Sequence, residues 1–420
     1  MSKSMQANLD YAQAKDQTDF LFHYRERFHF PQHEGKDVVY FCGNSLGLQP
    51  KSVAFLMTQE LKDWADYGVE GHFKAKNPWF GYHHLFTKSL ANLVGAKDDE
   101  VVAANALTVN LHLLMMSFYR PTKKRYKIIM EAGAFPSDQY AMETQVKMHG
   151  FHPEDAIIEL KPKKGKHCID TKDILETIEK TGDKLAMVMM GGVNYYTGQF
   201  FNLKSITATA HKVGAMAGFD LAHAVGNVPL DLHKWKVDFA CWCSYKYLNA
   251  GPGAVAGLYV HQNHGRNPET PRLAGWWGHN EKKRFKMEKS FVPMKGAESW
   301  QMSNAPVLNM VGLLASMDIF DKVDMEQLRS KSTELTGYLE FLLKQITHIP
   351  FTIITPSETK DRGCQLSLLF DKRGKEVFEK LTNAGVVADW REPNVIRIAP
   401  VPLYNTFEDC YRFYEVLKNM

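Results

Sequence analysis

The sequence predicts an α/β protein with a large domain, built on a mainly parallel sheet covered by helices, and a smaller α+β domain after it. Between about residues 52 and 320, helical stretches alternate with short apolar runs, as in βαβ units. Beyond this region the pattern changes to shorter strands around one helix. The length of 420 residues is sufficient for two domains with separate cores.

Each element of this prediction depends on a short stretch of the chain. Apolar runs predict strands of the large domain at residues 127–130, 156–160, 185–190, 215–219, 239–243 and 254–260. Residues 305–345 have the spacing of a helical hairpin. Strands at 351–354, 364–370 and 395–398, with a helix at 376–383, predict the small domain. We therefore expect an N-terminal arm and helix packing with the small domain (1–50), a large domain (51–310) and a small domain (311–420).

Composition excludes several classes of protein. The net charge is only +4 and the basic residues are scattered, which argues against nucleic-acid binding. There is no run of about 18 apolar residues, so we expect no membrane span. The N-terminus is polar where a signal peptide would be apolar, and six cysteines are spread along the chain. These features favour a reduced, cytoplasmic protein.

The most informative feature is an acid followed by a lysine 26 residues later, Asp220 and Lys246, each after a short apolar run. This order suits an enzyme that uses pyridoxal phosphate. Such a site needs a carboxylate facing the pyridine nitrogen and a lysine that forms a Schiff base and moves protons. Side chains at strand ends of an open α/β sheet face the ligand crevice, which is where both residues are expected.

Two segments upstream could complete a cofactor site. Thr108 is predicted as the N-cap of a helix whose free N–H groups would bind a phosphate. Phe135 follows a strand and could stack on a flat ring, while Asp138 could form a hydrogen bond to the ring or its supports. Taken alone, the first segment is a simple capped helix and the second a strand-to-helix turn with a Ser or Asp cap.

Other motifs favour structural roles. The glycines at 251–257 have the wrong spacing for a dinucleotide loop. His72, His83 and His84 have no acid or cysteine at ligand spacing, so we expect no metal. Cys364 begins a predicted strand and is expected in the core. Arg397 lies within a strand, where it is either a surface or structural pair, or a bidentate partner for an amino-acid carboxylate.

Seven segments together resemble the kynureninase family over nearly the whole chain. They are Asn44-Ser-Leu-Gly-Leu, Phe135-Pro-Ser-Asp138, Asn194-Tyr-Tyr-Thr-Gly-Gln, Asp220-Leu-Ala-His-Ala-Val-Gly-Asn227, Cys241-Trp-Cys-Ser-Tyr-Lys-Tyr-Leu-Asn-Ala-Gly251, Gly275-Trp-Trp-Gly-His279 and Arg397-Ile-Ala-Pro-Val-Pro-Leu-Tyr404. The resemblance implies a fold-type I, aspartate aminotransferase-like large domain with a seven-stranded sheet, and a homodimer with shared active sites. It implies hydrolysis of L-kynurenine or 3-hydroxykynurenine to anthranilate or 3-hydroxyanthranilate plus L-alanine, in tryptophan catabolism and NAD biosynthesis.

The resemblance also implies roles for individual residues. Lys246 is the Schiff-base lysine, Asp220 faces the pyridine nitrogen, and Tyr245 is a possible acid. The other cofactor contacts that it implies are Leu107, Thr108, Phe135, Pro136, Ser137, Asp138, His223 and Tyr245, with Trp276 and Asn304 from the partner subunit. The implied substrate contacts are Arg397, His72, Ser303 and Asn304. One departure is Gly191, where many relatives carry serine near the phosphate.

Two alternatives remain open from the sequence. Another fold-type I enzyme, an aminotransferase or a cysteine desulfurase, would share the fold, although a desulfurase needs a mobile reactive cysteine. A non-catalytic binding protein would be expected to lack Lys246, Asp220 or Arg397, and all three are present. The preferred ketone and the choice between a catabolic and a biosynthetic role do not follow from the sequence.

Overall fold

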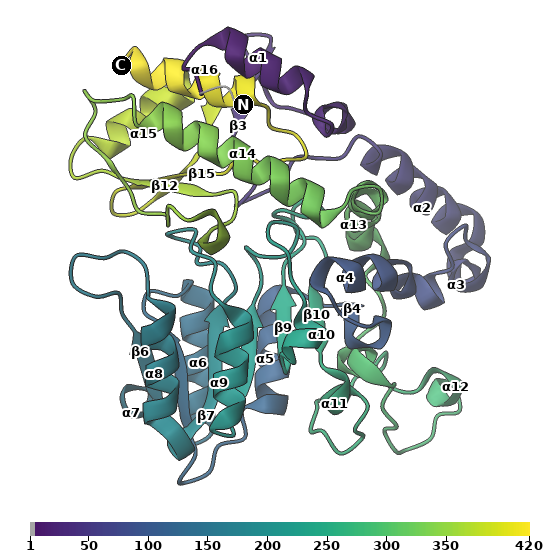
Figure 1. The fold of residues 1–420 in the computed structure, drawn as a ribbon. Helices are drawn as coiled ribbons and strands as arrows, with labels where there is room; N and C mark the ends of the chain where they lie inside the picture. The colour runs from purple at the N-terminus through teal and green to yellow at the C-terminus, as the bar shows by residue number, and fades with distance from the viewer. Residues whose placement is uncertain (1–4) are drawn as a thin grey trace.

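A seven-stranded sheet forms the centre of the larger part of the molecule, in the order β4–β10–β9–β8–β7–β5–β6. The computed structural model describes residues 5–420 (Figure 1). The strands are β4 (Val101–Ala103), β5 (Lys127–Glu131), β6 (Ile157–Leu160), β7 (Leu185–Gly191), β8 (Met216–Asp220), β9 (Phe239–Trp242) and β10 (Gly257–Val260). Strand β10 is antiparallel to β9 and β4, whereas the pairs from β9 to β6 are parallel.

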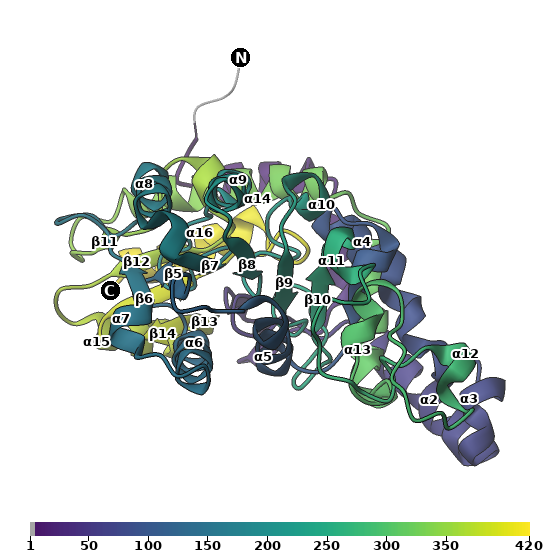
Figure 2. The same ribbon diagram turned by 90° about the horizontal axis from the view of Figure 1, so that it is seen from below.

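Helices cover both faces of this sheet. Figure 2 shows α8 (Thr171–Thr181) and α9 (Leu203–Lys212) on one face, with α5 (Leu107–Phe118) and α6 (Pro136–Met148) on the other. Burial on both sides explains why the strands read as continuous apolar runs. Packing is tight: a Cβ on Gly218 of β8 would lie 2.0 Å from the Phe239 ring.

The smaller part is an antiparallel sheet in the order β11–β12–β15–β14. Its strands are β11 (Thr352–Ile353), β12 (Leu366–Leu369), β14 (Asp389–Arg391) and β15 (Val395–Ile398). It shares one core with α1 (Leu9–Gln17), α14 (Met325–Leu343), α15 (Gly374–Asn383) and α16 (Phe407–Lys418). The N-terminal arm joins through β3 (Val39–Tyr40), which pairs with β13 (Val386–Val387).

A third group of helices extends from the body of the molecule (Figure 1). It contains α2 (Val53–Tyr67), α3 (Gly71–Lys74), the 3₁₀ helix η3 (Trp79–Phe86), α4 (Thr87–Val94) and α13 (Val307–Phe320). The remaining short elements are β1 (Gln32–His33), β2 (Lys36–Asp37), α7 (Pro153–Ala156), α10 (Leu232–Trp235), α11 (Gln262–Gly265), α12 (Glu281–Arg284), η1 (Phe22–Arg27), η2 (Gly68–Glu70), η4 (Asp98–Glu100), η5 (Gly182–Lys184), η6 (Gly296–Trp300) and η7 (Thr359–Asp361).

The predicted fold class is confirmed, including the seven-stranded sheet and the smaller C-terminal part. The region predicted as a helical hairpin contains two helices, α13 and α14, and the second begins where Asp324 forms a capping box with Gln327. The two helices pack mainly into different cores, α13 with the large sheet and α14 with the small one. Several details differ: the short strands β3, β4, β13 and β14 were not predicted, β10 begins at Gly257 rather than at 254, and β12 is shorter than the predicted 364–370. The boundaries 50/51 and 310/311 stay predictions.

Within the described residues, no helix is both long and apolar enough to cross a bilayer. Residues 1–4, which form half of the polar stretch that argues against a signal peptide, lie outside the described residues.

Candidate functional site

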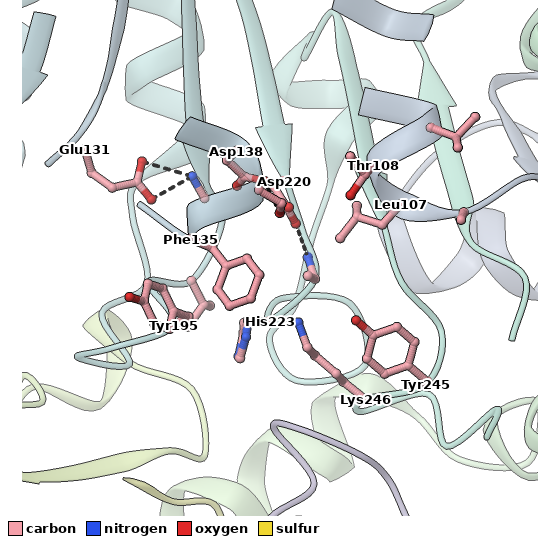
Figure 3. A pocket seen from close by; sticks show the side chains of 16 residues that line it. Leu107, Thr108, Glu131, Phe135, Asp138, Tyr195, Asp220, His223, Tyr245 and Lys246 are labelled. Atoms are coloured by element: carbon pink, nitrogen blue, oxygen red, sulfur yellow. Dashed lines mark hydrogen bonds between the residues drawn. The ribbon is translucent and has the colours of Figure 1, made fainter. Parts of the chain in front are cut away.

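A pocket of about 300 Å³ opens at the carboxyl ends of β5, β7 and β8 (Figure 3). Strand ends place Glu131, Gly191 and Asp220 in its wall, as expected for a crevice in an open α/β sheet. Nine of the predicted site residues line it: Leu107, Thr108, Phe135, Ser137, Asp138, Asp220, His223, Tyr245 and Lys246. Pro136 begins helix α6 next to them.

Two buried carboxyl groups, Asp220 and Asp138, share a hydrogen bond in the pocket. Burial raises the pKa of Asp138 well above its ordinary value, and the charges of Asp220 and Glu131 raise it further. Burial also raises the pKa of Asp220, but the Lys246 charge, the Ala222 N–H at 2.7 Å and the bond from Asp138 lower it. The pKa of Asp138 is therefore raised further than that of Asp220, which makes Asp138 the donor and Asp220 the acceptor of their hydrogen bond.

Lys246 lies in the turn between β9 and β10, and the N-terminal arm holds this turn. The Gly47 N–H donates to the Tyr245 carbonyl at 2.8 Å, and the Asn249 N–H to the Lys246 carbonyl at 2.9 Å. A Cβ on Gly47 would lie 2.3 Å from that Lys246 oxygen, so only glycine permits this approach. The Lys246 ammonium lies 5.8 Å from the centre of the Phe135 ring, inside the pocket.

The first turn of α5 lines the pocket and is suited to bind an anion. Its N-cap is Ala106, which has no side-chain capping bond, so the first N–H groups of the helix are available to a ligand. The prediction of Thr108 as N-cap was wrong, because extended backbone at Ala106 starts the helix two residues earlier. The predicted Ser or Asp cap of α6 was also wrong: Phe135 occupies the cap position and Pro136 starts the helix.

His223 is a buried imidazole whose Nδ1 has no hydrogen-bond partner among the described residues. Burial and the charges of Lys246, Arg397 and Arg391 lower its pKa well below the ordinary value, so the ring is neutral. Phe135 is 40% exposed and leaves a ring face open. A flat, phosphorylated pyridine aldehyde fits these groups, because it would offer partners to His223, Asp220, Lys246 and the first turn of α5.

Sequence reasoning missed Glu131, which is buried in the pocket wall and accepts the Gly191 N–H at 3.1 and 3.2 Å. Burial raises its pKa to about 7. A Cβ on Gly191 would lie 2.9 Å from the Glu131 carboxylate, so the glycine leaves room for it. In Figure 3 Glu131 and Thr108 lie at opposite sides of the view, with Asp138 and Asp220 between them. The position of Glu131 at a strand end was the available signal.

Arg397 is fully buried in β15 and held by Asp389, which was also missed. Its Nη2 and Nε donate to the two Asp389 oxygens at 2.7 and 3.3 Å, and its Nη1 donates to the Tyr195 carbonyl at 2.7 Å. Tyr195 is part of the pocket lining, so Arg397 lies just behind the wall. Three of the five guanidinium N–H groups are used, which leaves two for a carboxylate.

Four predicted residues lie away from Lys246 within the chain. His72 and Asn304 line a second pocket of about 280 Å³, together with Trp79. Ser303 is exposed, and Trp276 is 41% exposed and contacts Phe285 edge to face. Within one chain, His72 and Asn304 therefore share a pocket, Ser303 and Trp276 are exposed, and none of the four residues lines the Lys246 pocket.

The cysteines and histidines outside the pocket give one confirmation and one correction. Cys364 is fully buried, and burial raises the pKa of its thiol to about 12, consistent with a core role. The expectation of no metal at His83 and His84 depended on the absence of an acid at ligand spacing in the sequence, but the fold brings Glu298 to them from a distant segment.

Comparisons with known proteins place the chain in a family. The kynureninase C-terminal domain family matches residues 328–417. Kynureninases from Flavobacterium psychrophilum and Myxococcus xanthus are 55% and 52% identical, covering 98% and 97% of this chain and 98% and 96% of theirs. The one from Nematostella vectensis is 48% identical and covers 97% of this chain and 93% of its own.

Solved structures agree with this architecture. A cysteine desulfurase from Escherichia coli superimposes with a TM-score of 0.77 at 18% identity, covering 95% of this chain and 98% of that one. One from Thermococcus onnurineus gives 0.74 at 17% identity, covering 91% and 94%. Identity this low shows the shared fold alone. Identities near 50% over almost the full length of the relatives show more: the chain belongs to the kynureninase family.

Proposed function

We propose that this protein uses pyridoxal phosphate to hydrolyse the Cβ–Cγ bond of L-kynurenine or 3-hydroxy-L-kynurenine. The products are L-alanine and anthranilate or 3-hydroxyanthranilate. One observation carries the proposal: Lys246, the Asp220 carboxyl group and the uncapped N-terminus of α5 line one pocket. The chain that holds this pocket belongs to the kynureninase family.

The pocket residues would hold the cofactor in one orientation. Lys246 would hold the aldehyde carbon, Asp220 the ring nitrogen and the first turn of α5 the phosphate, with Phe135 against the ring. When bound, pyridoxal phosphate supplies an electron sink for the bonds around the substrate α-carbon. Asp220 would keep a proton on the ring nitrogen, and Asp138 would stabilise the Asp220 carboxylate by donating a hydrogen bond to it.

Other residues move protons at the substrate. With the substrate amine bound in place of the lysine, the Lys246 amine would be free to take the α-proton. Water then adds to the aryl ketone, and the Cβ–Cγ bond breaks to leave a carboxylic acid on the aromatic ring. Burial raises the pKa of the Tyr245 phenol, so its Oη keeps a proton and can donate it to the departing β-carbon.

Two other reaction classes share the fold and are separated by a substrate panel. Holoenzyme should release an aromatic acid from kynurenine or its 3-hydroxy form, and should neither form persulfide from cysteine nor transfer the amino group of alanine to a 2-oxo acid. The burial of the cysteines argues against desulfurase activity, because that reaction needs a mobile, reactive cysteine and none of the six is exposed. Persulfide formation or amino transfer without kynurenine cleavage would overturn the proposal.

Arg397 is proposed to bind the substrate α-carboxylate with its two free N–H groups. Arg397→Ala should lower kcat/KM for kynurenine about ten- to a hundredfold, since a charge-assisted contact contributes about 1.5–3 kcal/mol. Arg391→Ala is the matched control, because Arg391 also pairs with Asp389 but is partly exposed. Equal kcat/KM in the parent and Arg397→Ala enzymes would rule the role out.

The active form is proposed to be a homodimer with shared sites. Helices α2 and α3 carry exposed large apolar side chains: Phe55, Leu61, Trp64, Tyr67 and Phe73. Trp276, Phe285 and Met287 on the loop around α12 are exposed as well. Such a concentration of apolar surface is typical of a protein interface. A second copy would also bring Trp276 and Asn304 to a pocket that they do not reach within their own chain.

Mixing Lys246→Ala with Trp276→Ala chains should restore activity that neither variant has alone. In a random mixture half of the dimers are hybrids, each with one site that contains both intact residues, so recovery should reach about a quarter of the parental rate. Chain exchange is verified by mass spectrometry of differently tagged copies. Complete exchange without recovery would argue against shared sites.

His72 and Asn304 are proposed to select the aryl group, because they line one pocket with the aromatic Trp79. An imidazole and an amide can bond a ring hydroxyl or aniline, and a polar site discriminates strongly when its partner is missing. His72→Trp and Asn304→Thr should each change the ratio of kcat/KM for kynurenine over 3-hydroxykynurenine. If both variants bind cofactor normally and keep the parental ratio, these residues do not set specificity.

A cytoplasmic location and a contribution to NAD biosynthesis are part of the same proposal. Six free cysteines, all at least partly buried, favour a reducing compartment. Deletion of the gene should create a nicotinate requirement if the product feeds NAD; growth without nicotinate would leave only the catabolic role.

A further inference from the structure

Among residues 5–420, two groups of three side chains bring possible metal-ligand atoms within 4.8 Å of one another. One is Glu100, His233 and His261. Its two imidazoles are stacked face to face, with 6° between the rings, so they do not converge on one point. The Glu100 oxygens already accept hydrogen bonds from the His233 ring and from the backbone N–H groups of Lys97 and Gln262. This group is a closed hydrogen-bond network.

The other group, His83, His84 and Glu298, has a different geometry. The histidines are neighbours in η3, and Glu298 comes from η6. The Nε2 atoms of His84 and His83 lie 3.1 and 3.8 Å from the same Glu298 oxygen. Ligands at about 2.0–2.1 Å from a tetrahedral zinc ion lie about 3.3 Å apart, so these separations bracket the required value.

His83 supplies an independent observation. Its side chain is only 4% exposed, and neither ring nitrogen has a hydrogen-bond partner among the described residues. Buried polar atoms without partners are rare and costly, because they lose their bonds to water and gain none. A ligand bound between His83 and Glu298 would give this ring the partner that it lacks.

We propose that His83, His84 and Glu298 bind one Zn²⁺ ion, with water in the fourth position on the side where His84 is 48% exposed. Two imidazoles and one carboxylate suit zinc better than magnesium or calcium, which prefer oxygen ligands only. The ion is separate from the Lys246 pocket, whose lining contains none of the three residues.

A zinc ion here would join two segments that flank the pocket of His72 and Asn304. Trp79 at the start of η3 lines that pocket, and Asn304 follows η6 by four residues. The ion would therefore fix the position of the aromatic wall relative to the Asn304 loop. Its role is structural, since no side chain of the group reaches the lysine.

The test is metal content of the holoenzyme after treatment with a chelator, addition of ZnCl₂ and gel filtration, measured by elemental analysis. The parent should retain one zinc per chain, and cobalt in its place should give the intense visible bands of tetrahedral Co²⁺. His84→Gln and Glu298→Gln should lose both signals while still binding pyridoxal phosphate. His84 is half-exposed and Glu→Gln conserves shape, so both variants should fold.

His233→Gln is the matched control, because it alters the other histidine–glutamate group and should leave the zinc content unchanged. Parent protein that retains no zinc, or variants at His84 and Glu298 that retain the parental content, would overturn the proposal. Loss of zinc from His233→Gln, with zinc kept in the His84 and Glu298 variants, would place the ion at Glu100, His233 and His261 and would also overturn the proposal.

Discussion

Replacing Lys246 with alanine should lower kcat/KM for kynurenine by at least about 10³-fold. The variant loses both the amine that holds the cofactor aldehyde and the base that moves the α-proton, and a positioned base alone contributes about 10²–10⁴-fold. The position of Lys246 explains the size of the effect, because it is the one lysine among the pocket-lining residues. The measurement is steady-state kinetics at saturating pyridoxal phosphate.

The control for this experiment is Lys234→Ala, at a side chain that is 80% exposed and pairs only with Asp231. This variant should keep the parental rate. Borohydride reduction of the parent, followed by peptide mapping, should label Lys246. Labelling of another lysine, or a Lys246→Ala enzyme within tenfold of the parent, would remove this residue from the mechanism.

Asp220→Asn should lower kcat/KM by about 10²–10³-fold, the usual loss when one preorganised electrostatic contact is removed. The amide keeps an oxygen for the Ala222 N–H, so the local structure should survive. An amide has no negative charge, however, and cannot keep a proton on the ring nitrogen. The expected result is normal cofactor content with slow turnover.

Asp138→Asn tests where the shared proton lies. Because Asp138 already holds a proton and donates to Asp220, an amide N–H can replace that donor. The loss should therefore stay within about tenfold, far less than in Asp220→Asn. Equal losses in the two variants would contradict the assignment of the carboxylate to Asp220.

The centre of the site could be predicted because its signals are local. Asp220 and Lys246 each follow an apolar strand, and parallel strands bring their carboxyl ends to one edge of the sheet. Glu131 carries the same signal, but a glutamate ending a strand is common and nothing nearby in the sequence distinguishes it. Helix caps at Ala106 and Phe135 depended on backbone geometry that residue type does not specify.

Residues that act through distant partners could not be predicted from spacing. The sequence allowed two roles for Arg397, a structural ion pair or a partner of an amino-acid carboxylate. The structure shows that the two roles are compatible, because Arg397 bonds to Asp389 and still has two N–H groups for a carboxylate. Glu298 lies more than 200 residues from His84, so only the fold reveals the group that they form. Trp276 and Asn304 would need a second chain to reach the Lys246 pocket, and spacing within one sequence does not indicate contacts between chains.

The most direct test of the central claim is to follow kynurenine cleavage in H₂¹⁸O. Hydrolysis of the Cβ–Cγ bond predicts anthranilate and L-alanine in equal amounts, with one ¹⁸O atom in the anthranilate carboxylate and none in alanine, measured by mass spectrometry. Lys246→Ala should form both products at least about 10³-fold more slowly. Kynurenine left intact, or consumed without labelled anthranilate and matching alanine, would contradict the proposed function.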